Sequence, residues 1–160
     1  MSKIDTSKLQ LRTGSGYPGK LADEMAGRSS YRLGDAGGLT QFGANLVILE
    51  PGAKSSLRHW HMHEDEFVLV TEGELVLVMD GGATPMGVGD CAAFKAGVAN
   101  GHHFINTSST VAKFLVVGTR AETEVAYYSD LDMMVKSGPD GSAFTRKDGS
   151  PVDPDLGEKT

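Results

Sequence analysis

Residues 52–73 read GAKSSLRHWHMHEDEFVLVTEG, and this stretch decides the fold. Within it, His59, His61 and Glu66 form an H-x-H-x(4)-E pattern that leads into apolar residues and ends at Gly73. Imidazole nitrogen and carboxylate oxygen are typical ligands of divalent transition metals. Three such side chains so close together in the sequence predict a metal site.

The spacing of the two histidines fits a β-strand. Residues i and i+2 of a strand point to the same face, about 6.6 Å apart along the chain. His59 and His61 can therefore approach one ion, each at roughly 2.0–2.1 Å. Glu66 has the wrong parity for the same uninterrupted strand, so the polar run 62–65 predicts a turn or bulge that brings Glu66 inward.

A second segment, residues 87–108, offers a fourth ligand. It reads GVGDCAAFKAGVANGHHFINTS, and its strand-like run begins at His102 and ends at Asn106. Gly97 and Gly101 let the backbone turn sharply before this run. His103 would point opposite to His102, and Asn106 is expected to fix a turn.

Two other polar residues of the first segment have alternative interpretations. His63 shares the parity of His61 but lies in the polar turn, which is more typical of a surface residue than of a ligand. Arg58 could bind a substrate carboxylate bidentately. A surface salt bridge between Arg58 and Glu64 or Asp65 is equally plausible.

The two segments resemble the two sequence motifs of the cupin superfamily. The first motif has histidine-x-histidine, a glutamate five residues on and a glycine seven beyond it, as in residues 59–73. Residues 89–106 resemble the second, which runs from glycine through proline-x-glycine to a histidine and an asparagine four residues later. Lys95 stands where proline is usual, and the stretch from Gly97 to His102 is two residues longer than the common spacing.

The resemblance implies both a fold and a set of metal ligands. The fold would be an all-β, double-stranded β-helix, which is a jelly-roll barrel of two antiparallel sheets. The interval from His102 to Asn106 matches the second motif and favours His102 over His103. One divalent ion per subunit would then be bound by His59, His61, Glu66 and His102.

The remaining sequence predicts one all-β domain. Short apolar segments recur between turn signals with almost no helical periodicity, which is typical of a barrel or sandwich; they are 39–50, 66–70, 75–79, 91–94, 102–106, 111–117 and 125–128. We expect a barrel over 38–128, an N-terminal arm over 1–37 with a candidate helical turn at 20–26, and a C-terminal arm over 129–160.

One strand carries apolar residues on both faces. If Glu66, Val68 and Val70 point inward, Phe67 and Leu69 point outward and need cover from another layer, an arm or a second copy of the chain. We therefore predict a homodimer.

Composition narrows the classes of partner. The formal net charge is -6 and the basic residues are scattered along the sequence. The sequence therefore has no cluster of positive charge that would bind nucleic acid or an anionic membrane. Cys91 is the single cysteine, which excludes an intrachain disulfide, and its apolar neighbours predict a buried residue. The chain has neither the apolar run of a signal peptide nor that of a membrane span, so a cytoplasmic location is expected.

These features lead to a functional hypothesis with two alternatives. Four protein ligands on a six-coordinate ion leave two positions for water, substrate or oxygen. We expect a small non-haem metalloenzyme of the dioxygenase or isomerase type, acting on a small oxygenated organic molecule with Fe, Mn, Zn or Ni. The alternatives are a cupin that binds or senses a sugar or metabolite without turnover, and a hydrogen-bonded histidine cluster without metal.

The catalytic acid and base are not assigned by the sequence. Three phenylalanines could line a barrel cavity that holds an organic ligand, although core filling is the more common explanation for such residues; they are Phe94, Phe104 and Phe114.

Overall fold

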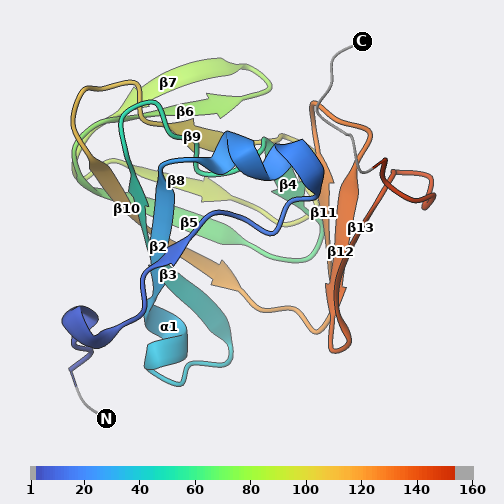
Figure 1. The fold of residues 1–160 in the computed structure, drawn as a ribbon, viewed down its shortest axis with the longest axis horizontal. Helices are drawn as coiled ribbons and strands as arrows, with labels where there is room; N and C mark the ends of the chain where they lie inside the picture. Colours follow the sequence, from blue (N-terminus) through green and yellow to red (C-terminus); the bar gives the residue numbers. More distant parts are fainter. Residues whose placement is uncertain (1–2, 154–160) are drawn as a thin grey trace.

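The computed structural model describes residues 3–153 of the chain. It is built almost entirely from antiparallel strands, which confirms the predicted all-β class (Figure 1). The end of the expected C-terminal arm, residues 154–160, lies outside the described residues.

The largest sheet has six strands. Their spatial order is β1 (Arg12–Thr13), β2 (Arg28–Arg32), β3 (Phe42–Leu49), β10 (Ala112–Thr119), β5 (Glu66–Glu72) and β8 (Cys91–Phe94). Every neighbouring pair in this sheet is antiparallel.

Two smaller sheets hold the other strands. One has the order β13 (Gly141–Thr145), β12 (Met134–Gly138), β11 (Glu124–Tyr128) and β4 (His59–His61). The other has the order β7 (Gly82–Met86), β6 (Leu75–Met79) and β9 (His103–Ile105). An antiparallel bridge between His59 and His102 joins β4 to the residue that precedes β9, so the two sheets meet at the histidines.

Within residues 3–153, helical structure is limited to three short segments. They are the 3-10 helices η1 (Thr6–Lys8) and η2 (Gly19–Met25) and the α-helix α1 (Leu33–Ala36). The helical turn expected at 20–26 falls within η2 and the residue after it. No helix in the described part of the chain has the length and apolar character needed to cross a membrane.

The segments expected to be arms both supply strands. From the N-terminal stretch, β2 pairs with β3 along its whole length, and β1 pairs with β2. From the C-terminal stretch, the hairpin β12–β13 extends the sheet of β11. Both stretches are therefore built into sheets.

The main core lies inside the barrel. Inward residues of β5 follow the expected alternation, since Val68 and Val70 are fully buried while Phe67 on the other face is 42% exposed. Burying one such valine stabilises the fold by roughly 1.5–3 kcal/mol. The prediction for Cys91 is wrong: Cys91 is exposed on the edge strand β8, and the alternate residues Ala92 and Phe94 face the core instead.

Two residues of the motifs have structural roles. Gly73 has φ of +72°, and a Cβ atom there would lie 2.7 Å from the carbonyl oxygen of Val111. Asn106 is fully buried; its Nδ2 donates to the carbonyls of Leu49 and Thr110, and its Oδ1 accepts from the backbone N–H and hydroxyl of Ser108. These hydrogen bonds agree with the predicted role of Asn106 in fixing a turn.

Candidate metal centre

The short strand β4 presents two imidazoles at one point. His59 and His61 are two residues apart on this strand, and their Nε2 atoms lie 3.1 Å apart. The chain then breaks at 62–65, as the parity argument predicted, and Glu66 begins β5 in the six-stranded sheet. Candidate ligand atoms of His59, His61 and Glu66 all lie within 4.8 Å of one another.

His102 approaches the same carboxylate from the bridge between β4 and β9. Its Nε2 lies 3.8 Å from Oε2 of Glu66, and its ring stacks on Phe94 with 3.5 Å between centroids. The side chain is 2% exposed, and neither ring nitrogen has a hydrogen-bond partner among the residues that the structure describes. A buried nitrogen without a hydrogen-bond partner destabilises the fold. A cation bound beside Glu66 would give the Nε2 atom of His102 a partner.

The hydrogen bond made by His59 determines which of its nitrogens is free. Nδ1 of His59 lies 2.8 Å from the carbonyl oxygen of Leu57. A carbonyl only accepts, so Nδ1 carries the proton and donates, which leaves the Nε2 lone pair directed at His61 and Glu66. Burial, together with the neighbouring His61, lowers the pKa of His59 to about 4, so this ring is neutral at neutral pH.

Opposite charges stabilise the rest of the cluster. Burial acts to raise the pKa of Glu66, but contacts with His102 and His61 outweigh it and hold that pKa well below its usual value. Burial acts to lower the pKa of His61, but Glu66 and Glu124 outweigh it and raise that pKa. Without a cation, the cluster therefore combines an ionised carboxylate with an imidazole that readily holds a proton.

Glu124 was missed in the sequence, although it supports the site directly. This buried residue begins β11, and its carboxylate accepts hydrogen bonds from the backbone N–H groups of Met62 and His63 at 2.8 and 3.0 Å. Its Oε1 also lies 3.8 Å from Nδ1 of His61. A carboxylate behind a ligating histidine orients the ring and raises its basicity, and no spacing rule in the sequence connects Glu124 to the first motif.

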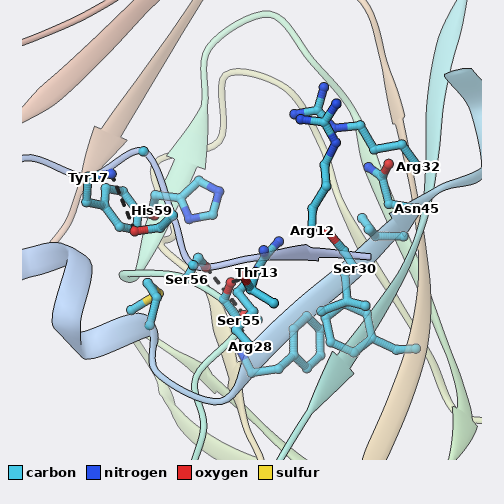
Figure 2. A pocket seen from close by; sticks show the side chains of 18 of the residues that line it. Arg12, Thr13, Tyr17, Arg28, Ser30, Arg32, Asn45, Ser55, Ser56 and His59 are labelled. Carbon is cyan, nitrogen blue, oxygen red and sulfur yellow. Dashed lines mark hydrogen bonds between the residues drawn. The ribbon is translucent and has the colours of Figure 1, made fainter. Parts of the chain in front are cut away.

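A cavity of about 530 Å³ opens from His59 and His102. Glu66, His102, Phe104 and Phe114 line it. His59 also lines it and is labelled in Figure 2.

The other two residues considered for a substrate pocket lie elsewhere. Phe94 lies behind His102 and lines a separate cavity. Arg58 does not line the main cavity; it pairs with Asp80 and Asp130, which are not the acidic partners considered from the sequence.

Three arginines also line this cavity, and sequence reasoning did not single them out. Arg12, Arg28 and Arg32 come from β1 and β2, within the stretch treated as an arm. The three arginines reach the cavity because β2 pairs with β3 and β1 pairs with β2, and this pairing was not predicted from the sequence.

The site and the fold together agree with the family comparison. Residues 45–118 match the model of the Cupin_2 family, described as a cupin domain. A crystal structure described as a sugar phosphate isomerase of the cupin superfamily, from Silicibacter pomeroyi, is 66% identical in sequence; the match covers 95% of this chain and 97% of that one, with a TM-score of 0.94. The chain belongs to the cupin superfamily.

More distant cupin structures extend the comparison. A protein from Acidithiobacillus ferrooxidans, assigned provisionally as a sugar phosphate isomerase, is 26% identical to this cupin over 92% of each chain, with a TM-score of 0.77. A polyketide cyclase from Streptomyces resistomycificus is 19% identical over 74% of this chain and 79% of its own, with a TM-score of 0.61, and shows the shared fold alone. None of the curated protein sequences matches this cupin.

Proposed function

We propose that this cupin is a metal-dependent isomerase of a sugar phosphate, with one divalent ion held by His59, His61, Glu66 and His102. The observation that carries the proposal is the meeting of three imidazoles, including the unpartnered ring of His102, and an ionised carboxylate beside a polar cavity. The 66% identical relative described as a sugar phosphate isomerase supports the choice of reaction.

The donor set suits the chemistry of such a reaction. Aldose and ketose sugars differ in which of two adjacent carbons carries the carbonyl oxygen. A divalent ion held by these residues would supply Lewis-acid chemistry to the oxygens of such a substrate. His59 is held in the ligating tautomer by Leu57, and the ionised Glu66 lowers the net charge of the site.

Other cavity residues are suited to orient a polyhydroxylated ligand. Ser30, Ser55, Ser56 and Asn45 line the cavity and offer hydroxyl or amide groups to sugar hydroxyls. Tyr17 also lines it; burial raises the pKa of Tyr17, so its phenol keeps a proton at neutral pH and can donate to a substrate oxygen.

One observation favours a second candidate, a cupin that binds a sugar or metabolite without turnover. Among the described residues that line the cavity, Glu66 is the only carboxylate, and we assign it to the metal. A base that removes a proton from carbon is therefore not evident beside the ligands. The binding and catalytic candidates differ in one measurable property, which is turnover.

The test begins with elemental analysis of untagged protein purified without a chelator. We expect about one iron, manganese, zinc or nickel ion per chain, and interconversion of an aldose phosphate and its ketose phosphate followed by NMR. Oxygen uptake is measured in parallel, because oxygen consumption without isomerisation would favour a dioxygenase. Metal binding without either reaction would favour the binding candidate.

Two variants and a matched control test the ligands. His61→Ala and Glu66→Ala should lose the metal and the stabilisation it gives, about 2.7 kcal/mol at a metal concentration 100 times Kd. His63→Ala should keep both, because His63 is exposed and its Nδ1 lies 3.1 Å from the carbonyl of Thr123. Full metal occupancy in His61→Ala would refute the assignment.

A further inference from the structure

We infer that Arg12, Arg28 and Arg32 form an anion site that binds the phosphate monoester of the ligand. The inference deepens the proposed function by naming the residues that recognise the phosphate. Phosphate binding itself can be measured whether or not isomerisation occurs.

Strand register places the three arginines on one face. Arg28, Ser30 and Arg32 are at alternate positions of β2, so they share a face. Arg12 of β1 is the direct antiparallel partner of Ser30, and directly opposed residues point to the same side of a sheet. Arg12 is therefore diagonal to both Arg28 and Arg32, and all three line the same cavity.

The arginines lack enough nearby negative charge. Among residues 3–153, no carboxylate forms a salt bridge with Arg12 or Arg28, and Arg32 has only Asp35, at 3.6 Å, with both side chains largely exposed. Arg28 is half-buried; its Nε donates to the carbonyl oxygen of Ser55 at 2.6 Å. Three guanidinium groups at one cavity of a chain with a net charge of -6 indicate a site for an anion.

The arrangement of these side chains also predicts the orientation of the ligand in the cavity. In Figure 2, the side chains of Arg12 and Arg32 extend toward the same end of the cavity, away from His59. Ser30 and Asn45 lie on the side of Arg12 and Arg32, while Ser56 lies on the side of His59 (Figure 2). A sugar phosphate would therefore place its phosphate among the arginines and its carbonyl carbon toward His59 and Glu66.

Arg12 makes the N-terminal segment part of this site. Strand β1 has two residues and, in the described part of the chain, pairs only with β2. Gly14, Ser15 and Gly16, which follow β1, also line the cavity. A phosphate bound by Arg12 together with Arg28 and Arg32 would tie this short edge strand to the barrel.

Calorimetric titration of the metal-loaded protein tests the site. The probes are inorganic phosphate, glucose 6-phosphate and glucose, and each titration is repeated after metal removal. We expect both phosphate compounds to bind more tightly than glucose, with affinity falling as salt is raised. Phosphate binding should persist without the metal, because the arginines do not depend on the ion.

Three substitutions locate the binding. Arg12→Gln and Arg32→Gln should each weaken glucose 6-phosphate binding by about 10- to 100-fold, the usual effect of losing a hydrogen bond to a charged group. Both residues are exposed, so the fold should be retained. Arg146→Gln is the matched control, because Arg146 lies on the loop after β13, outside the cavity lining, and should bind like wild type.

The outcomes separate this inference from the proposed function. Arginine-dependent phosphate binding without isomerisation would support the anion site and refute the isomerase. Isomerisation with unchanged affinity in both cavity variants would refute the anion site and leave the isomerase standing. An equal loss in Arg146→Gln, or no phosphate binding by wild type, would also overturn the anion site.

Discussion

The Nε2 atoms of His59 and His61 lie 3.1 Å apart on one short strand. Because Nδ1 of His59 donates to Leu57, its Nε2 can only accept. In the metal-free protein, Nε2 of His61 therefore carries a proton and donates it to Nε2 of His59. This agrees with the raised pKa of His61 and the lowered pKa of His59. A metal ion must displace that proton.

The first prediction concerns pH. The pKa of His61 lies above its usual 6.5, so below that raised pKa the metal competes with a bound proton. Metal affinity should fall by about tenfold per pH unit as pH drops through the pKa of His61, and stay nearly level above it. Titration of metal-free protein between pH 5.5 and 8.5, in buffers of different ionisation enthalpy, should show release of about one proton below the pKa of His61 and almost none above it. A pH-independent affinity would exclude His61 as a protonated ligand.

A second prediction concerns Glu124. Glu124→Gln removes the charge behind His61 and one of the acceptors for the backbone of Met62 and His63. Metal affinity should fall by about 10- to 100-fold with the barrel still folded. Glu122→Gln, at an exposed position nearby, is the control and should bind metal normally. Equal affinity in the two variants would show that Glu124 acts on the backbone alone.

The third prediction concerns stability without reference to metal. Asn106→Ala removes the side-chain donor to the buried carbonyl of Leu49 and to the partly buried carbonyl of Thr110. We expect a loss of about 2–4 kcal/mol in the free energy of unfolding, measured by denaturant titration of metal-free protein. The exposed Asn100→Ala should cost much less. A small loss at Asn106 would mean that water replaces the amide.

The homodimer stays a prediction, and Phe67 offers its test. Phe67 is 42% exposed on the outer face of β5. Light scattering on the wild type should give twice the mass of one chain, and Phe67→Asp should shift the population toward monomer. Leu39→Asp, at a similarly exposed position in a loop, should not. A wild type that is monomeric at tens of micromolar would refute the dimer.

Apolar runs and the first motif made much of the barrel predictable. Strands such as β6 and β8 fall where apolar residues lie between turn signals. By contrast, β2 reads RSSYR, because its cavity face is polar, and it has no apolar alternation to reveal it. The same applies to the β12–β13 hairpin, whose two strands contain two glycines and two serines.

The residues of the candidate site likewise fall into a group that the sequence predicted and a group that it did not. His59, His61 and Glu66 are close in sequence, so spacing alone was enough to group them. Glu124 and the arginines meet the site only through strand pairing between distant segments, which spacing does not encode. The exposed position of Cys91 likewise depends on which edge β8 occupies.

The placement of Arg12 has an evolutionary consequence. The candidate ion ligands lie on β4, on β5 and just before β9, whereas Arg12 lies on a two-residue strand at the sheet edge. Substitutions or length changes before β2 can therefore alter which anions are accepted while leaving the ion-binding chemistry intact. Related chains could diversify in ligand choice through this segment alone, and a chimera that exchanges residues 1–27 would transfer that choice between them.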